Sequence, residues 1–143
     1  MDFSLNEEQL TWQKKAREFA NTKIRPISMD RDQIEGGFGP WDWSVIEEGS
    51  KLGFRTQAVP KKWGGEGTGF VTQALVMMEL AKGDSAICKA FSQNWKWSHL
   101  IVNACNEDQK ERFLKPFIKA FLKVQLPLTL IPLSPTRLYY GFG

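Results

Sequence analysis

The spacing of apolar residues and of helix-capping residues constrains the fold of this chain more than any other feature of its sequence. Ser4 with Glu7, and Asn6 with Gln9, have the spacing of a capping box and predict a helix that begins near Asn6 or Glu7. The apolar face expected for that helix is Leu10, Ala16, Phe19, Ala20 and Ile24. The chain therefore opens with a pattern typical of helix.

Proline and glycine divide the next stretch into further elements. Pro26 disfavours helix at Arg25 and suits the first turn of a following short helix. Residues 36–39 contain three glycines and predict a loop, after which Pro40 opens another helix. The apolar positions of that helix are Val45, Ile46 and Leu52. Gly53 occupies the place where a left-handed helix cap is expected.

Between residues 54 and 69 the helical spacing disappears, and a long structured connection is predicted. Four glycines lie within residues 64–69, which invites comparison with a phosphate-binding loop. No strand precedes this run, and no Lys-Ser or Lys-Thr pair completes a P-loop. We therefore interpret these glycines as turn formers, with direct phosphate contact as the less favoured alternative.

Two further helices are predicted after this connection. The first ends near Gly83, and the second is capped by Asp84 or Ser85. The apolar face expected for the first is Val71, Ala74, Leu75 and Met78. The stripe expected for the second is Ile87, Phe91, Trp95 and Val102, with His99 on the same side.

A last helix and the end of the helical pattern define the predicted fold class. Asn106 and Gln109 form another capping pair. The apolar residues that follow are Phe113, Leu114, Phe117 and Ile118. No convincing strand precedes residue 120, so we predict an all-α bundle of about six helices over residues 1–119. Residues 120–143 hold three of the seven prolines and no acidic residue, which predicts a divergent Pro- and Leu-rich tail.

Composition excludes several classes of function. The net charge is only +3, and residues 1–119 are almost balanced, so no nucleic-acid footprint is present. No apolar run approaches the roughly 20 residues of a membrane span. Cys88 and Cys105, with His99, do not have a zinc-binding spacing, and no metal site is expected. Reduced thiols and an N-terminus without leader character predict a soluble, cytoplasmic protein.

The remaining candidate residues favour structural roles. We interpret His99 as a packed, hydrogen-bonded histidine rather than a general base. Glu79 and Lys82 have the spacing of a surface ion pair, which is preferred over a catalytic carboxylate. The six tryptophans are scattered along the chain and indicate core or interface packing rather than a stacking platform. No nucleophile, base and orienting group come together, so no catalytic residue is predicted.

Six segments, taken together, resemble the N-terminal domain of acyl-CoA dehydrogenases in order and spacing. They are residues 3–9 (FSLNEEQ), 17–20 (REFA), 24–26 (IRP), 59–67 (VPKKWGGEG), 79–84 (ELAKGD) and 106–110 (NEDQK). The resemblance covers residues 3–119. It implies an FAD-dependent enzyme that desaturates an acyl-CoA thioester between its α and β carbons. A glutamate would remove the α proton, the flavin would accept hydride, and an electron-transferring flavoprotein would reoxidise it.

The resemblance also implies that this chain contributes one wall of the acyl pocket. Cys88, Lys89 and Ser92 fall at positions that face the distal acyl chain in the family, while no cofactor-binding residue is expected in this chain. An unpaired ammonium in an apolar pocket is costly. Lys89 therefore indicates a rotated helix, a lysine that reaches solvent, or an acyl group with an acidic end such as a dicarboxyl-CoA.

The chain departs from the family after residue 119. The family's Thr-Glu-Pro and Gly-Ser-Asp motifs, and the region of its catalytic glutamate, are absent. We expect a truncated or frameshifted product that is inactive alone and binds no cofactor by itself. The alternatives are an acyl-CoA oxidase or flavin monooxygenase of the same superfamily, or a non-enzymatic helical interaction module. Exposed apolar surface would allow the chain to form a homo-oligomer.

Overall fold

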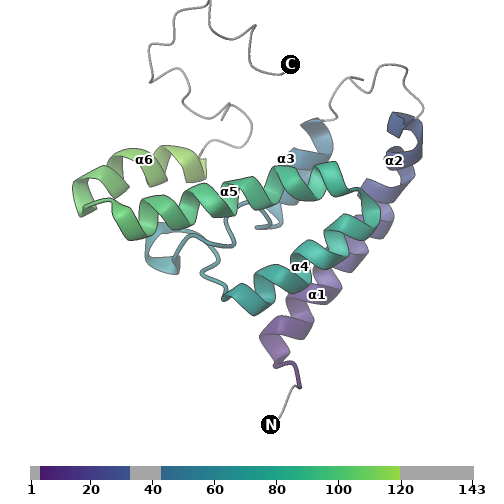
Figure 1. Cartoon of the computed structure of the whole chain (residues 1–143), viewed down its shortest axis with the longest axis horizontal. Helices are drawn as coiled ribbons and strands as arrows, with labels where there is room; N and C mark the ends of the chain where they lie inside the picture. Colours follow the sequence, from purple (N-terminus) through teal and green to yellow (C-terminus); the bar gives the residue numbers. More distant parts are fainter. Residues whose placement is uncertain (1–3, 33–42, 120–143) are drawn as a thin grey trace, which may run out of the picture.

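The structure is a computed structural model that describes residues 4–32 and 43–119, and these ranges contain helices and no strand. The elements are α1 (Glu7–Phe19), η1 (Ala20–Ile24), α2 (Arg25–Asp32), α3 (Trp43–Lys51), η2 (Lys61–Trp63), α4 (Phe70–Gly83), α5 (Ser85–Ala104) and α6 (Glu107–Lys119). η1 is a π-helical segment and η2 a 3-10 turn. The predicted all-α fold of about six helices is confirmed (Figure 1). The expected loop at 36–39, the helix start at Pro40 and the tail at 120–143 lie outside the described residues.

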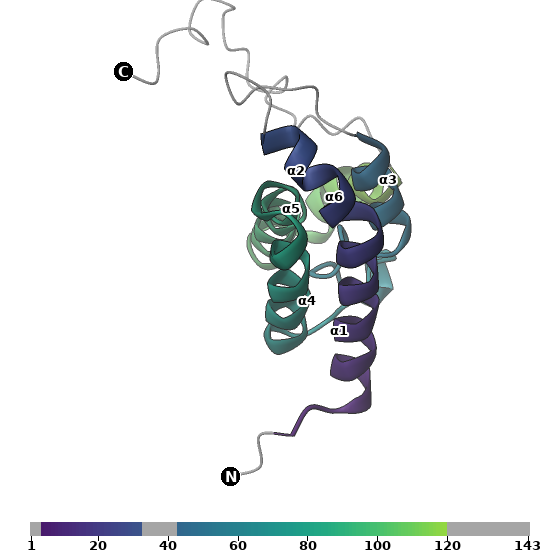
Figure 2. The ribbon, with the colours of Figure 1, turned by 90° about the vertical axis from the view of Figure 1, so that its right-hand side faces the viewer.

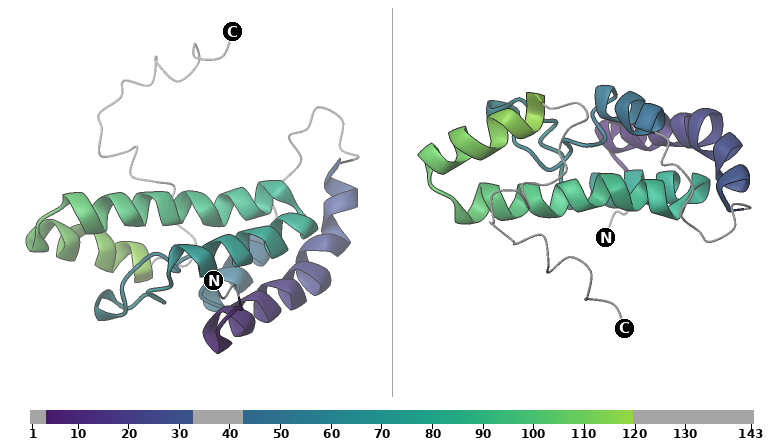
Figure 3. Two further views of the ribbon diagram at one scale, coloured as in Figure 1. Left: turned by 60° about the horizontal axis from the view of Figure 1, so that its bottom comes forward. Right: turned by 90° about the horizontal axis from the view of Figure 1, so that it is seen from above.

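The helices are arranged in two layers. α4 and α5 form one layer, and α1 and α3 form the second (Figure 2). α1 packs along α4, and α5 runs the length of the molecule with α3 and α6 beside it (Figure 3). Within the described ranges, no helix has both the length and the hydropathy that a bilayer span requires.

Aromatic rings from both layers meet at the centre of the core. Phe54, which is fully buried, belongs to the connection after α3 rather than to a helix. Its ring lies 5.3 Å from that of Phe19 and 6.1 Å from that of Phe91, measured between ring centroids. The indole N–H of Trp95 donates to the Phe54 carbonyl over 2.6 Å. Phe54 therefore joins the connection between α3 and α4 to helices α1 and α5.

Glycines allow α3 and α4 to approach their neighbours closely. A Cβ added at Gly49 would lie 2.4 Å from Cζ of Phe91, and one added at Gly83 would lie 2.9 Å from Cβ of Ile24. Real Cβ atoms do not come this close to a packed side chain. The helix backbones therefore contact the core directly at these two positions.

The N-terminal helix begins as predicted, at the second of the two candidate capping boxes. The Asn6 side chain accepts from the Gln9 N–H over 2.9 Å, and the Gln9 side chain accepts from the Asn6 N–H over 3.0 Å. Four of the five residues predicted for its apolar face are buried: Ala16, Phe19, Ala20 and Ile24. The prediction was wrong for Leu10, which is 50% exposed because it lies before the part of α1 that meets the core.

The prediction that Pro26 disfavours helix at Arg25 was also wrong. Arg25 is helical, and its N–H bonds to the carbonyl of Ala20, five residues earlier. A proline ring inside a regular α-helix collides with the carbonyl four residues before it. In the wider π turn of η1 the carbonyl groups are spaced differently from those of an α-helix. The helix therefore continues into α2, with Pro26 in the first turn of α2.

α4 presents to the core a different face from the one predicted. Val71, Ala74 and Met78 are exposed, while the buried residues are Thr72, Gln73, Val76, Glu79 and Leu80. Three of these five buried residues are polar, so a search for apolar spacing selects the outer face instead. The expected end of the helix near Gly83 is confirmed.

The connection between α3 and α4 is ordered by backbone hydrogen bonds, as the sequence predicted. Gly53 closes α3 with φ +91°, and Gly64 and Gly67 also have positive φ, which confirms their turn-forming role. The N–H of Gly67 donates to the Val59 carbonyl over 2.8 Å, so the glycine run folds back along the segment before it. A Cβ at Gly65 would lie 2.3 Å from the Val59 carbonyl oxygen, so only glycine fits there.

Candidate functional site

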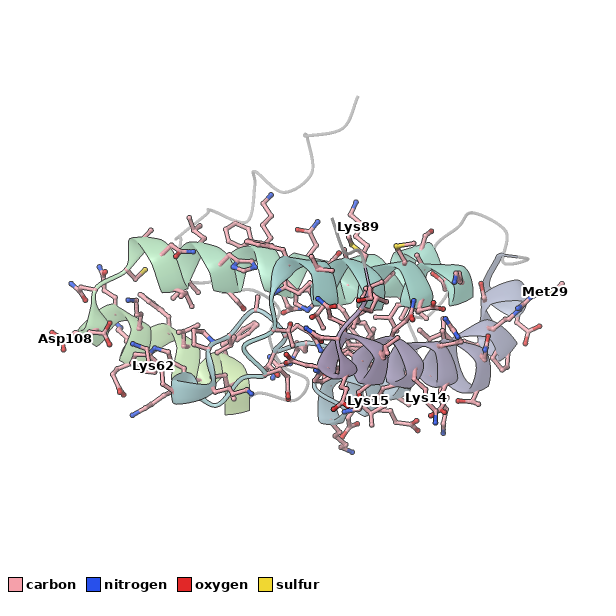
Figure 4. The ribbon with its side chains drawn as sticks, turned by 90° about the horizontal axis from the view of Figure 1, so that it is seen from below. Lys14, Lys15, Met29, Lys62, Lys89 and Asp108 are labelled. Atoms are coloured by element: carbon pink, nitrogen blue, oxygen red, sulfur yellow. The ribbon has the colours of Figure 1, made fainter. Side chains whose placement is uncertain are left out.

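The first half of α5 carries the three residues predicted for the acyl pocket. The Asp84 side chain caps this helix by accepting from the N–H groups of Ala86 and Ile87 at 2.7 and 3.0 Å. From that fixed start, Lys89 points into solvent on the side of α5 away from α1 (Figure 4). Among the described residues, none pairs with its ammonium group. Ser92 is half-buried and donates to the Lys89 carbonyl over 3.2 Å.

Cys88 turns toward the core rather than toward solvent. It is 5% exposed, and its thiol donates to the Met77 carbonyl of α4 over 3.3 Å. Burial raises the pKa of this thiol, and the negative charge of Asp84 raises it further. The thiol is therefore protonated at neutral pH and unsuited to act as a nucleophile. The structure thus places the three predicted residues at three depths, and their pocket role stays a prediction.

Helices α4 and α5 carry exposed apolar side chains together with exposed lysines. α5 contains Lys89 and Lys96 and no acidic residue. The exposed large apolar residues of the two helices are Phe70, Val71, Met77, Met78, Trp97 and Leu100. We call this surface, with the two lysines, the outer face. It would suit an acyl chain or an apolar partner better than a polyanion.

A chain of polar side chains joins the connection to α4 and α5. The Thr68 hydroxyl donates to Oε1 of Gln57 over 2.7 Å, and the amide of Gln73 donates to the Thr68 carbonyl over 2.8 Å. Nε2 of His99 lies 3.1 Å from Oε1 of Gln73. The imidazole also stacks on the ring of Phe70, with centroids 4.8 Å apart. The predicted packed, hydrogen-bonded His99 is confirmed, and no nucleophile within the described residues contacts it.

The sequence did not reveal the remaining members of this chain. Gln57 and Gln73 are separated by 16 positions, and neither lies in a recognisable motif. Gln57 is completely buried, and Nε2 of its amide has no hydrogen-bond acceptor in the described structure. The only signal available was the break in apolar spacing on α4 at Thr72 and Gln73.

Glu79 is a buried carboxylate with two cationic partners, which corrects the predicted surface pair. Its side chain is 3% exposed, and it accepts from Nε and Nη2 of Arg17 at 3.3 and 2.9 Å. Nζ of Lys82 lies 3.1 Å from both carboxylate oxygens. Hydrogen bonding from Arg17 lowers the pKa of Glu79, burial opposes this, and Lys82 lowers it further. The carboxylate is therefore ionised and structural, since it joins α1 to α4.

The described residues contain no cluster of metal-ligating side chains. In residues 4–32 and 43–119, no three His, Cys, Asp or Glu side chains come together. Thr68 of the connection, Gln73 of α4 and His99 of α5 are joined by hydrogen bonds within the domain.

Comparison with known proteins identifies the class to which this helical fold belongs. Glutaryl-CoA dehydrogenase of Desulfococcus multivorans is 38% identical over 89 residues, which are 61% of this chain and 22% of that protein. 3-Sulfinopropanoyl-CoA desulfinase of Variovorax paradoxus is 34% identical over 80 residues, 56% of this chain and 19% of that protein. The solved structure of butyryl-CoA dehydrogenase from Megasphaera elsdenii superposes with a TM-score of 0.71 at 29% identity, over 82% of this chain and 31% of that one.

The names of all three similar proteins refer to coenzyme A thioesters. The sequence model described as "Acyl-CoA dehydrogenase, N-terminal domain" matches residues 6–120. The chain belongs to this acyl-CoA dehydrogenase N-terminal domain family. It spans between about a fifth and a third of the length of these relatives.

Proposed function

We propose that the chain is the N-terminal helical domain, or a truncated form, of an FAD-dependent acyl-CoA dehydrogenase. In this proposal α5 contributes one wall of the acyl pocket. The single observation that carries it is the family match over residues 6–120, which includes all of α5. The exposed apolar side chains of the outer face support it, because a thioester's hydrocarbon chain needs such a surface.

The proposed division of labour leaves the chemistry to parts outside this chain. When bound in the full-length parent, FAD supplies hydride acceptance, and an electron-transferring flavoprotein is the proposed partner. The residues of this chain hold the acyl group and exclude water. Cys88, Lys89 and Ser92 are the proposed pocket residues. Since no catalytic residue is proposed here, we expect the chain alone to be colourless and to reduce no dye with any acyl-CoA.

We further propose that the acyl group carries an acidic end. Lys89 supports this because its ammonium group has no acidic partner within the described structure, and α5 offers none. Two relatives support it as well, since glutaryl and 3-sulfinopropanoyl groups both end in an acid. A carboxylate beside an ammonium in a water-poor cleft forms a strong, charge-assisted hydrogen bond.

Titration of the isotopically labelled 143-residue chain with glutaryl-CoA and pentanoyl-CoA tests both proposals. The two thioesters have five-carbon acyl groups and differ only in the terminal carboxylate. We expect both to shift the NMR signals of α5 amides, with glutaryl-CoA binding about tenfold more tightly through one charge-assisted contact. Lys89→Gln should abolish that preference. Lys14→Gln, an exposed lysine of α1, is the control and should preserve it.

The outcomes separate the two proposals. If neither thioester shifts α5 signals more than free coenzyme A does, the pocket wall is wrong. If both thioesters bind equally well, the pocket wall stands and the acidic substrate is wrong. If the preference survives Lys89→Gln, the role of Lys89 is wrong. A purified chain with a flavin absorbance band and dye-reducing activity would contradict the proposal that catalysis needs the rest of the parent.

The outer face also favours a second candidate, a helical interaction module that self-associates. Phe70 is 75% exposed and Met78 60%, which is unusual for large apolar side chains of a monomer. An acyl-CoA oxidase or flavin monooxygenase of the same superfamily has no observation of its own in its favour. The binding titration distinguishes the candidates, because a module of this kind would leave α5 unaffected by the acyl group.

A further inference from the structure

Arg55 is a buried cation whose partners are backbone carbonyls rather than a carboxylate. The residue is 6% exposed, its Nη1 donates to the carbonyl of Phe117, and its Nη2 donates to that of Ile118 over 3.0 Å. The guanidinium lies 4.7 Å from the centroid of the Phe117 ring. In the part of the chain that the structure describes, no acidic side chain pairs with it. Burial lowers the pKa of Arg55, which nevertheless remains a cation at neutral pH.

These contacts satisfy the C-terminal end of α6. The last four carbonyls of a helix have no donor within the helix, and Phe117 and Ile118 hold two of the four in α6. A cation at this end also meets the negative pole of the helix dipole. Pro116 removes one N–H from the same turn, so the turn has fewer internal hydrogen bonds and depends more on Arg55.

We propose that Arg55 is a positioning residue that fixes the last turn of α6, the turn at which the family match ends. The family match ends at residue 120, one residue after α6, and the segment matched in the glutaryl-CoA dehydrogenase is 22% of that protein. The proposal is independent of the acyl pocket, because Arg55 lies on the connection and not on the outer face.

Hydrogen exchange of the 143-residue chain, measured by mass spectrometry, tests the proposal. Arg55→Met keeps the aliphatic stem and removes all donors. We expect the amides of residues 117–119 to exchange about tenfold faster, from the loss of hydrogen bonds to a charged group. Amides of α1 and α4 should be unchanged. Arg55→Lys, with one ammonium in place of a two-pronged donor, should show a smaller increase.

Arg112→Met is the matched control. Arg112 also lies over a phenylalanine of α6, with its guanidinium 5.7 Å from the Phe113 ring, but it is exposed and bonds to neither Phe117 nor Ile118. Unchanged exchange at 117–119 in Arg55→Met, or an equal increase in Arg112→Met, would overturn the proposal. If Arg55→Met accelerates exchange throughout the chain, the Arg55→Lys variant decides. An increase confined to residues 117–119 supports the proposal, and the absence of any increase there refutes it.

Discussion

The carboxylate of Glu79 shows how a single residue sets the pH range of the fold. Arg17 holds its pKa below the ordinary value of 4.5, so the folded state binds its proton more weakly than the unfolded state does. The stabilisation is therefore complete above about pH 4.5 and is lost as the pH falls through the lower, folded-state pKa.

We expect Glu79→Gln to lower the free energy of unfolding by about 1–3 kcal/mol at pH 7, from lost hydrogen bonds to charged groups. The difference from the unchanged chain should shrink as the pH falls from 7 toward 3. Chemical denaturation at a series of pH values measures this. Glu18→Gln is the control, since Glu18 is exposed and 3.9 Å from Lys14, and should cost less than about 0.5 kcal/mol. A difference that does not vary with pH would contradict the assignment.

Gly49 gives a second prediction at the scale of one residue. Alanine favours helix over glycine by up to about 1 kcal/mol, but its methyl would collide with Phe91. Overpacking costs about 1–3 kcal/mol, so we expect Gly49→Ala to lower the melting temperature. Gly69→Ala is the control, because nothing lies within 4 Å of the added methyl. Equal melting temperatures for the two variants would refute the close approach.

At this scale, local signals in the sequence were reliable and long-range partners were not. The capping pairs at Asn6 and Asn106 were predicted correctly because both partners lie three residues apart. The Glu79–Lys82 pair was predicted for the same reason. Arg17 lies 62 positions from Glu79, and its guanidinium supplies the positive charge that allows the Glu79 carboxylate to be buried. Nothing in the sequence connects them until α1 and α4 are packed.

At the scale of the element, α4 shows the limit of reasoning from apolar spacing. Hydrophobic periodicity identifies the apolar face of a helix. It does not show whether that face packs against the core of the same domain. On α4, Val71 and Met78 remain exposed, while the polar residues Gln73 and Glu79 are buried with specific partners. For α5 and α6, whose inner faces are apolar, the predicted stripes are confirmed at Phe91 and Leu114 among others.

The two faces of α4 are distinguished by a pair of alanine substitutions. Leu80 is completely buried, so Leu80→Ala should cost about 2–5 kcal/mol of unfolding free energy. Met78 is 60% exposed, so Met78→Ala should change it by less than about 0.5 kcal/mol. Urea denaturation measures both. If Met78→Ala proved the more costly of the two, the orientation of α4 described above would be wrong.

At the scale of the whole molecule, the outer face determines how the isolated chain behaves in solution. We expect the chain to bind a hydrophobic dye and to elute from a sizing column as more than one species. The double variant Val71→Glu, Met78→Glu should reduce both effects, since it places charge on exposed positions without disturbing the core. Leu10→Glu, at a 50% exposed position of α1, should not. A monodisperse, dye-free starting protein would contradict this expectation.

The fold class was predictable from the sequence because helix caps and apolar spacing act over a few residues. The candidate site was less so, because its pieces come from α4, α5 and the connection, and their contacts depend on packing. Phe54, Gln57 and Arg55 belong to a stretch without periodicity, yet all three are buried. A segment without helical periodicity can therefore contribute many buried residues to a core. The sequence of such a segment does not show which of its residues are buried.

The π-helical segment η1 allows α1 and α2 to form one continuous helical stretch that contains Pro26. A π turn holds one residue more than the α turn it replaces, and deletion of one residue from Ala20–Ile24 would restore an unbroken α-helix. Because the extra residue is taken up within the wider turn, the helix beyond the deletion would keep its orientation about the helix axis. Pro26 would then follow a regular α turn, and its ring would collide with the carbonyl four residues before it. We therefore expect loss of the π turn to be tolerated only when Pro26 is replaced as well.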